Sequence, residues 1–546
     1  MKTSIHKYLV IGILTVAAMT ACNKQLDEFN PGGTTTDAVF STPEGFESLV
    51  NAAYTYNRWW YGKEEGYSIS EMGTDIWTSG TGDKYPDITN YNNLQASNSV
   101  MSVLWKQLYA AINLCNTGIG RIDKAGLTAD RQKIRNAELH FLRAFYYWHI
   151  VETWGPVHFT LTETSGVITT ANRTPADTFY AQIFRDLDVA VNDLPVTTSD
   201  YGRVTKPAAE AFLARMCLTR GKNQQAADLA DKVIKNYGYT LLAKYADLWR
   251  MDNLQNKEVI WAVNYMKNLV FDDRADATLF PNGHSRGANN GHLMFAMKYD
   301  DLPGMQRDIL NQRPFNRYMP TLFLLNLFDE TADARYEASF KQVWYCNNLK
   351  TAPAGVKLGD TAVLCSKKVI STMLPYRVYD RNAVYSTNGG GKDRTHYVSL
   401  QKFDDPTRAS INEEQSARDV FIIRLAEMYL VAAEAQFNLG NGAKAADYIN
   451  VLRKRAAIPG HEAAMQVTAA DISIDFLLDE RARELAGEQL RWFDLKRTGK
   501  LATRIALHNP DANQYFQSYH MLRPIPQDQI DAVSNKGEFK QNDKYN

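Results

Sequence analysis

The sequence predicts a mostly α-helical protein in which tetratricopeptide-like helix pairs form a single scaffold that carries a loop-rich, irregular ligand-binding region. Apolar residues recur at helical spacing over much of the chain, as in "AELHFLRAFYYWHIVETWGPV". Two distant segments repeat one helix–turn–helix pattern. Long stretches dense in Gly, Asn, Asp and Pro interrupt the helices, and loops of this length in a compact protein are usually functional or disordered.

Composition excludes several functional classes. The chain has 546 residues, of which 45% are hydrophobic and 22% charged, so it can bury a large core. Lys+Arg and Asp+Glu both total 61, and this balance gives no reason to expect a nucleic-acid partner. The ten histidines are scattered and no CxxC or HExxH motif occurs. We therefore expect no metal site and no cofactor.

Residues 1–21 have the pattern of a bacterial signal peptide. Lys2 and Lys7 precede the apolar run "YLVIGILTVAAM", which is too short to span a bilayer. The following "MTAC" resembles a lipobox, in which the signal is cut before Cys22 and that cysteine is lipidated. Plain secretion with a coincidental Cys22 is the alternative. We expect residues 22–40 to form a lipidated N-terminus and a tether.

Residues 41–270 are predicted to form the N-terminal helical part. Within it, apolar residues surround the helix at 137–157 on nearly all sides, which places this helix in the middle of a helical body. Arg143 and His149 on the same helix are expected to be satisfied core residues rather than ligands. Gly155 and the proline that follows it should end the helix.

Two similar segments of the sequence indicate the repeating unit of the scaffold. The segments "LARMCLTRGKNQQAADLADKVIKN" and "AAEAQFNLGNGAKAADYINVLRKRA" each carry a helix, a glycine (Gly221 or Gly440), then Ala-Ala-Asp and a second apolar helix. A turn of small residues lets two antiparallel helices cross closely, which is typical of tetratricopeptide-like pairs.

The loop-rich region is predicted at 271–410, with short strands at most, and is followed by a C-terminal helical part and tail at 411–546. Residues 71–95 share its polar, Gly-rich character and add Trp77 and two tyrosines. We expect these two loop regions to form the ligand surface, held by the helical scaffold.

The cysteines after Cys22 fall into two groups. Cys115 and Cys217 sit in apolar, helical contexts and are expected to be buried thiols. Cys346 and Cys365 lie in the loop-rich region of an exported protein, so they could form a disulfide or remain as two free thiols.

The charged helices near the C-terminus are expected to brace one another. Arg481 lies in an apolar row of its helix, and Glu427 lies in an apolar row of another. Since a buried charge without a partner costs several kcal/mol, we expect Glu427 and Arg481 to pair. Asp479 and Arg483 are expected to pair along their own helix.

A rival interpretation makes Glu480 and Glu484 the acid/base pair of a glycosidase, because four-residue spacing puts them on one helical face. Neighbouring arginines would lower their pKa values, whereas a general acid needs a raised pKa. Two glutamates on one helix also cannot easily flank a glycosidic bond. The structural interpretation is therefore favoured.

Nine features in chain order resemble the SusD/RagB family of outer-membrane nutrient-binding lipoproteins, and the resemblance runs almost end to end. They are the lipobox at Cys22, "SEMGTDIW", "AELHFLRAFYYWHIVETWGPV", "GRVTKPAAEAFLARMCLTRG", "NKEVIWAV", "VFIIRLAEMYLVAAEAQFNLG", "LLDERARELAGEQLRWFDLKRTGKL", "LRPIPQDQI" and the late "QN". Most of these motifs belong to the scaffold and do not specify a cargo.

The resemblance implies a function as well as a fold. Family members sit on the cell surface at the outer membrane over a SusC-like TonB-dependent transporter, capture oligosaccharides or polysaccharides, and deliver them to that transporter without catalysis. RagB-like members capture peptides, so a peptide cargo is the first alternative. A surface glycoside hydrolase and a protein-only tetratricopeptide-like adaptor are alternatives from other classes.

Candidate cargo-contacting residues follow from sugar chemistry. Aromatic rings stack on the C–H faces of sugars, while carboxylates, amides and guanidinium groups bind hydroxyls. For each candidate, packing within its own loop is the alternative. The loop residues of these types are Trp77, Asp75, Tyr85, Tyr91, Asn92, Arg286, Asn289, Trp344 and Tyr345.

Overall fold

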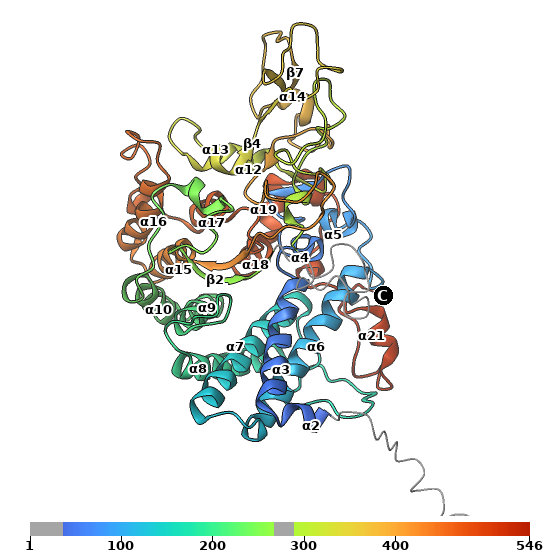
Figure 1. The fold of residues 1–546 in the computed structure, drawn as a ribbon, viewed down its shortest axis with the longest axis vertical. Helices are drawn as coiled ribbons and strands as arrows, with labels where there is room; N and C mark the ends of the chain where they lie inside the picture. Colours follow the sequence, from blue (N-terminus) through green and yellow to red (C-terminus); the bar gives the residue numbers. More distant parts are fainter. Residues whose placement is uncertain (1–35, 267–288, 546) are drawn as a thin grey trace, which may run out of the picture.

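The computed structural model describes residues 36–266 and 289–545, so the signal-peptide prediction, Cys22 and Arg286 fall outside the described residues. The described chain is mostly helical, as predicted (Figure 1). Its longer helices are α3 (Pro43–Thr55), α6 (Ser99–Arg121), α7 (Ala129–Trp154), α8 (Ala176–Asp193), α9 (Lys206–Thr219), α10 (Asn223–Asn236), α15 (Leu425–Asn438), α16 (Gly442–Ala456), α17 (Ile474–Leu485) and α19 (Leu501–His508).

Shorter elements connect and cover these helices. The short α-helices are α2 (Thr36–Phe40), α4 (Glu64–Ser70), α5 (Pro86–Asn90), α11 (Gly291–Met294), α12 (Leu322–Asn326), α13 (Arg335–Ser339), α14 (Arg381–Val384), α18 (Arg491–Arg497), α20 (Pro510–Asn513) and α21 (Gln527–Ala532). The 3₁₀ turns are η1 (Tyr56–Trp59), η2 (Ile122–Lys124), η3 (Tyr245–Trp249), η4 (Ala469–Asp471) and η5 (Ser518–Met521).

The strands are short and pair in small ladders. They are β1 (Trp77–Ser79), β2 (Val259–Val263), β3 (Tyr318–Pro320), β4 (Phe340–Lys341), β5 (Val343–Tyr345), β6 (Thr361–Cys365), β7 (Arg377–Tyr379), β8 (Ser399–Leu400) and β9 (Val420–Arg424). The ladders β1–β3, β2–β9, β4–β8 and β5–β6 are antiparallel, and β6–β7 is parallel.

Helix α7 is the central helix of the body, as its all-round apolar pattern predicts. Its N-terminus is capped by Thr128, whose hydroxyl accepts from the Arg131 N–H. It ends at Gly155, which has φ +75° and so adopts a backbone conformation that favours glycine. The helix packs against α6 on one side and α8 on the other, and nearly all of its second half is buried.

The two segments that echo each other in sequence lie side by side. They form the pairs α9/α10 and α15/α16, and α10 packs directly on α15 (Figure 1). Gly221 (φ +67°) and Gly440 (φ +82°) make the tight turns within the pairs. The alanines that follow each turn are buried at the contacts: Ala226, Ala227, Ala445 and Ala446. Small side chains therefore allow the close helix crossings that the pattern predicts.

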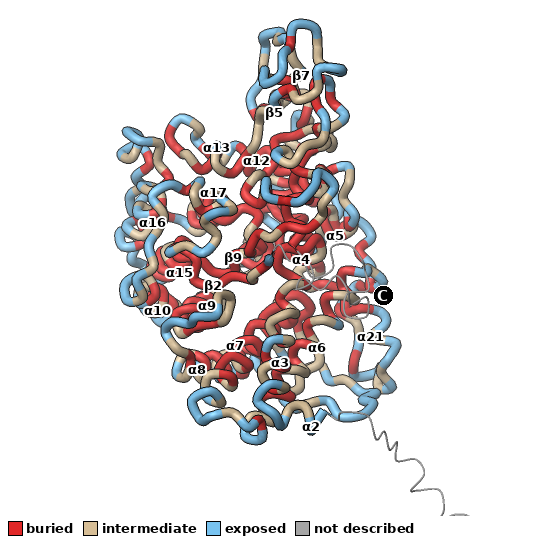
Figure 2. The backbone as a smooth tube through the Cα atoms, viewed as in Figure 1, coloured by how far each residue is buried: buried red, intermediate tan, exposed pale blue. Residues whose placement is uncertain are grey.

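The loop-rich region has a hydrophobic core of its own. Side chains from β1, β3, α11, α12 and the strands β4–β8 form a second cluster beside the large helical core. Strands β5–β7 and α14 rise from this cluster as a protrusion at the upper end of Figure 1, and Figure 2 shows that its tip is largely exposed. Among the described residues, no helix is long and apolar enough to cross a membrane.

The ladder β2–β9 joins the strand that precedes the loop-rich region to the strand that follows it. Val259 pairs with Arg424 and Val263 pairs with Val420, with register shifts between them. The ladder packs on α9, so both ends of the loop-rich region are fixed to the helical scaffold. This arrangement also places β2 beside the end of α3, where the cavity described next opens.

Candidate functional site

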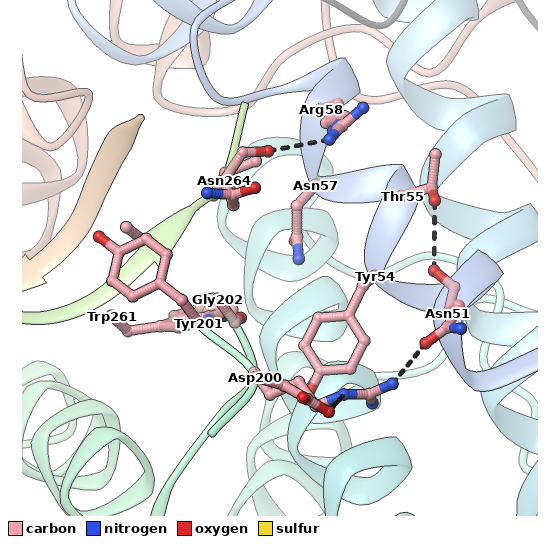
Figure 3. A pocket seen from close by; sticks show the side chains of 13 residues that line it. Asn51, Tyr54, Thr55, Asn57, Arg58, Asp200, Tyr201, Gly202, Trp261 and Asn264 are labelled. Carbon is pink, nitrogen blue, oxygen red and sulfur yellow. Dashed lines mark hydrogen bonds and ion pairs between the residues drawn. The ribbon is translucent and has the colours of Figure 1, made fainter. Parts of the chain in front are cut away.

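A cavity of about 600 Å³ opens between the end of α3, the turn at residues 200–203 and strand β2 (Figure 3). Its volume is in the range of small-ligand sites. Three chain segments that are distant in sequence supply the walls. The lining residues are Asn51, Tyr54, Thr55, Asn57, Arg58, Asp200, Tyr201, Gly202, Arg203, Trp261, Ala262, Val263 and Asn264.

Aromatic rings form two sides of the cavity. The Tyr54 hydroxyl accepts a hydrogen bond from the Val204 N–H at 3.1 Å, and the Arg203 guanidinium lies 5.5 Å from the Tyr54 ring centroid. Trp261 donates its indole N–H to the Gly202 carbonyl at 3.0 Å, so the turn at 200–203 is fixed to β2. Tyr201 is half-buried on the same turn. These contacts hold the rings in defined positions before any ligand binds.

Asn57 points into the cavity from η1. Figure 3 shows its side chain between Tyr54, Tyr201 and Asn264. Asn57 is only 3% exposed, and its Oδ1 has no hydrogen-bond partner among the described residues. A buried amide oxygen without a partner costs free energy comparable to a lost hydrogen bond. The end of the side chain seen toward Tyr54 and Tyr201 in Figure 3 is the amide nitrogen. The oxygen is itself buried, so a ligand could reach it only if the side chain moved.

Asn264 is held from behind by a buried carboxyl group. Its Nδ2 donates to Asp419 Oδ1 at 3.2 Å, and the Tyr265 N–H donates to the same oxygen at 2.8 Å. Arg58 donates to the Asn264 carbonyl at 2.9 Å. Burial raises the pKa of Asp419 to about 7, although the Tyr265 N–H, Arg418 and Arg58 favour its ionised form.

The cavity is suited to binding a polar molecule with an apolar face. Amide groups and two arginines line it together with the rings of Tyr54 and Tyr201, and groups of these kinds suit sugar recognition. Among the described residues that line it, Asp200 supplies the only carboxylate, whereas glycoside hydrolysis ordinarily uses two carboxyl groups on either side of the bond. The described lining therefore offers groups that can bind a polar ligand.

The structure places Trp77 and Asp75 in the core and not on a ligand surface. Trp77 has no exposed surface, its indole N–H donates to Glu71 at 3.0 Å, and its ring centroid lies 4.8 Å from that of Phe295. Asp75 is also fully buried and pairs with Arg491 and Arg504. Although burial opposes it, these arginines lower the pKa of Asp75. The polar loop around Trp77 in sequence folds under other segments, which local pattern could not show.

The other candidates at 71–95 are also mostly buried. Tyr85 is 6% exposed, and its hydroxyl donates to Glu65. Tyr91 is 2% exposed and donates to the Gly73 carbonyl at 2.8 Å. Asn92 is exposed. For Tyr85 and Tyr91 the structure shows the loop-packing alternative.

The candidates after residue 288 do not join one surface. Asn289 is buried, and its amide donates to the Arg418 carbonyl while its oxygen accepts from the Gly291 N–H. Trp344 is 2% exposed in the second core. Tyr345, on the next position of β5, is 58% exposed on the protrusion. Asn92 and Tyr345 are thus the exposed members of the predicted set among the described residues, and neither lines the cavity.

The predicted pair of Glu427 and Arg481 is wrong. Glu427 binds Arg215 of α9 through two hydrogen bonds of 2.7 Å, and Arg481 donates to Asp494 of α18 at 2.7 Å. Both side chains are buried as expected. The prediction fails because α9 and α18 supply closer partners than the helices considered, which only the tertiary packing reveals.

The predicted pair of Asp479 and Arg483 is also wrong. Asp479 pairs with Arg504 of α19. Arg483 pairs with Glu480, three residues before it, at 2.8 Å and also donates to the Leu327 carbonyl. Arg483 therefore pairs with the carboxylate three residues before it and not with the one four residues before it.

Glu480 and Glu484 are buried and bound to arginines, as the structural interpretation predicts. Arg335 Nη1 lies 2.8 Å from Glu480 Oε1 and 3.0 Å from Glu484 Oε2. Despite burial, Arg335, Arg483 and Arg453 lower the pKa of Glu480 to about 2. Arg455, Arg424 and Arg335 likewise hold the pKa of the buried Glu484 well below its ordinary range. Neither carboxyl group has exposed surface or the raised pKa of a general acid.

Cys346 and Cys365 are free and buried, so the disulfide alternative is not formed in the structure. Tyr345 pairs with Thr361 and Val343 pairs with Leu364, which places the two cysteines at opposite ends of the β5–β6 ladder. Bridging requires Cα atoms within roughly 7 Å. Cys115 and Cys217 are buried thiols, as predicted.

Arg143 and His149 are satisfied core residues, as predicted. Arg143 donates to Asp186 and Asn116, and His149 lies 3.1 Å from the Tyr61 hydroxyl. Burial lowers the pKa of His149 to about 3, so the imidazole is neutral at physiological pH.

Sequence reasoning missed the cavity residues because the three segments are distant and none carries a motif. One signal was present in "NAAYTYNRWW" at 51–60, where polar and aromatic residues alternate at the end of a helix.

Comparison with known proteins gives consistent matches over most of the chain. Residues 257–545 match the family model described as the SusD family, and residues 35–218 match the model described as "Starch-binding associating with outer membrane". The chain is 25% identical to SusD-like protein P2 of Formosa agariphila, covering 97% of this chain and 98% of that protein. It is 24% identical to the starch-binding protein SusD of Bacteroides thetaiotaomicron, covering 88% and 85%.

Solved structures match the fold. A laminarin-binding SusD-like protein aligns with TM-score 0.67 at 23% identity, over 92% of this chain and 99% of that chain. Surface glycan-binding protein A from Bacteroides fluxus aligns with TM-score 0.68 at 20% identity, also over 92% and 99%. At these identities the structural likeness concerns the fold.

Proposed function

The chain belongs to the SusD family, and from this premise we propose that it is a non-catalytic cell-surface lipoprotein that captures an oligosaccharide or polysaccharide. The observation that carries the proposal is the open cavity of about 600 Å³ lined by Tyr54, Tyr201 and the amides of Asn51, Asn57 and Asn264. Rings for the apolar face of a sugar and amides for its hydroxyls meet there in one place. The printed names of relatives that bind starch or laminarin support a glycan cargo.

Delivery to a transporter is the second part of the proposal. We propose that the lipid on Cys22 anchors the protein to the outer membrane, and that a SusC-like TonB-dependent transporter receives the cargo. Anchoring is tested by Cys22→Ala, which should release the protein from the membrane fraction. Partnership is tested by purifying the membrane-extracted protein, where a barrel-sized companion identified as a TonB-dependent transporter is expected.

Affinity electrophoresis through gels that contain single polysaccharides tests capture. We expect one or more neutral polysaccharides to retard the protein without releasing reducing ends. Product release would overturn the non-catalytic assignment. The absence of retardation across the panel, together with binding to peptides, would favour the RagB-like alternative.

A pair of variants tests where the cargo binds. Tyr201→Ala removes a ring from the cavity and should weaken retardation about three- to tenfold, the range of a single aromatic contact. Tyr345→Ala removes an exposed ring from the protrusion and should leave mobility unchanged. The reverse pattern would move the site to the protrusion and overturn the assignment of the cavity, while glycan capture itself would stand.

A further inference from the structure

The tip loop, residues 160–172, carries two adjacent apolar side chains far out in solvent. Val167 is 91% exposed and Ile168 is 60% exposed. Gly166, just before them, has φ +70°, and a Cβ atom there would meet no atom of the described chain within 4 Å beyond its two neighbours. Residues 164–172, "TSGVITTAN", also carry no charge. Exposed apolar surface of this kind marks a place of contact with an apolar partner.

Hydrogen bonds fix the tip loop to the body on both sides of these residues. On one side, the Asn116 amide of α6 donates to the Thr160 and Thr162 carbonyls at 3.2 Å. On the other, Ser534, which follows α21, donates to the Thr169 carbonyl from its N–H at 2.7 Å and from its hydroxyl at 2.9 Å. The apolar tip is therefore held out from the body, and little further ordering is needed for it to enter an apolar phase.

The tip loop lies beside the point where the described chain begins. Arg121, the last residue of α6, pairs with Glu163 of the tip loop at 2.8 Å and also with Asp37 of α2. Figure 1 shows α2 at the lower end of the molecule and the protrusion of β5–β7 at the upper end. The tip loop and the start of the described chain therefore share the end that is opposite the protrusion.

The length of chain before α2 limits how far this end can lie from a lipid on Cys22. Cys22 and Thr36 are 14 residues apart, and even a fully extended chain spans only about 3.6 Å per residue, or about 50 Å over this length. Because the tip loop is tied to α2 through Arg121, it is held at the same end as the anchor. The bilayer is therefore the apolar phase that a lipidated Cys22 would bring to the tip loop.

An aromatic cavity borders the tip loop. Ile168 lines a cavity of about 340 Å³ together with Trp105 and Tyr109. Tryptophan and tyrosine rings are enriched where a membrane meets water, because each has an apolar body and a polar edge. Among the described residues that line the cavity, Lys106 is the only lysine, arginine, aspartate or glutamate, and it pairs with Asp528 at 2.5 Å. This face therefore suits an apolar contact that persists at high salt.

We propose that Val167 and Ile168 insert into the outer leaflet of the membrane as a second contact beside the lipid anchor. The inference rests on the proposed function, because it takes the lipid on Cys22 as the anchor. Two apolar side chains cannot replace an acyl chain, since membrane affinity grows with each buried methylene group. Their effect is to orient the protein: with the tip loop in the lipid, the protrusion at the other end is directed away from the membrane (Figure 1).

Fluorescence of the full lipoprotein in vesicles tests the contact. The protein is reconstituted alone in phosphatidylcholine vesicles, with a water-sensitive dye on the thiol of Val167→Cys. Tyr345→Cys, at an exposed position of the protrusion, is the matched control. The unsubstituted lipoprotein gives the background, since the cysteines that the structure describes are buried. We expect the dye at position 167 to emit at shorter wavelength and to be quenched by brominated phosphatidylcholine, at low and at high salt, while the dye at position 345 stays in water.

Other outcomes of this experiment would overturn the inference in distinguishable ways. If the lipoprotein floats with the vesicles but the dye at position 167 is as exposed to water as the control, the inference fails and the anchor stands. If the dye is shielded only when a co-purified transporter is added, the tip loop is a protein contact and the inference also fails. If the lipoprotein does not float with the vesicles, the anchor and the inference fail together.

A charge at the tip gives the second test. Ile168→Asp, added to the labelled Val167→Cys protein, should move the dye back into water, because a carboxylate in the hydrocarbon region is costly. Leu349→Asp is the matched control, since Leu349 is 56% exposed between β5 and β6 of the protrusion, and it should leave the dye shielded. Both positions are exposed, so both variants should fold. A dye that remains shielded in the Ile168→Asp variant would contradict insertion of the tip.

Discussion

Arg335 and Glu484 form a buried ion pair with 3.0 Å between Nη1 and Oε2, although 149 residues separate them in the sequence. Arg335 belongs to α13 of the loop-rich region and Glu484 to α17 of the C-terminal part. The same glutamate also accepts from Arg424 at 2.7 Å. The contact between Arg335 and Glu484 therefore fastens the loop-rich region to the helical scaffold.

Glu484→Gln should destabilise the protein by about 3–5 kcal/mol, because it leaves buried arginines facing a neutral amide. Urea unfolding followed by circular dichroism measures the loss. Glu337→Gln is the control, since Glu337 is an exposed residue of α13 beside Arg335, and it should change the free energy of unfolding by less than about 0.5 kcal/mol. A Glu484→Gln variant as stable as this control would contradict a structural role for the pair.

Trp77→Ala should destabilise the protein by about 3–5 kcal/mol, because it removes a large side chain without exposed surface and leaves a cavity beside Phe295. Thermal unfolding measures the effect. At a temperature where the variant is folded, its affinity for the bound glycan should equal that of the wild type. If the folded variant binds the glycan more weakly than the wild type, Trp77 is a ligand-contacting residue after all.

Asp419→Asn should change how stability depends on pH. Burial raises the pKa of Asp419 to about 7, whereas an unfolded aspartate titrates near pH 4, at about 3.9. Between these values the folded state of the wild type holds a proton that the unfolded state releases, so its stability falls as pH rises through this window. The variant has no titratable group at this position. Its stability relative to the wild type should therefore rise by about 1–3 kcal/mol from pH 4 to pH 8.

Chemical denaturation at pH 4, 6 and 8 checks this difference for both proteins side by side. A difference in unfolding free energy that stays constant over the range would show that Asp419 ionises normally in the folded state.

Reducing agent should leave the stability unchanged, because Cys346 and Cys365 stand at opposite ends of the β5–β6 ladder as free thiols. Unfolding midpoints with and without dithiothreitol should agree, and both cysteines should be alkylated when the protein is unfolded without reductant. A midpoint that falls by several degrees in dithiothreitol, as loss of a disulfide would cause, would contradict the structure.

The helical scaffold was predictable because its signals are local. The all-round apolar helix at α7 and the glycine turns at Gly221 and Gly440 depend on residues a few positions apart, and the structure has them where periodicity and turn chemistry put them. The burial of Glu427 in α15 and Arg481 in α17 could also be predicted, because each has apolar residues four positions before and after it. The partners of these side chains could not be predicted, because Arg215 and Asp494 come from helices whose packing is decided by the whole chain.

The binding site was not predictable from the same signals. A tryptophan in a polar loop has the same local pattern whether the loop is exposed or covered, and Trp77 is covered. The cavity, by contrast, needs three segments to meet at Asn57, Tyr201 and Asn264. None of them has a spacing that sets it apart from ordinary helix ends and turns.

The antiparallel pairing of β2 with β9 lets the chain between these strands vary in length without disturbing the fold. Because Val263 and Val420 pair in the ladder, the chain between them is a long loop whose two ends are held together. Each doubling of the length of such a loop adds only about 0.6 kcal/mol to the entropic cost of closing it. Insertions and deletions can therefore accumulate within it during evolution, while the helices beneath keep their contacts.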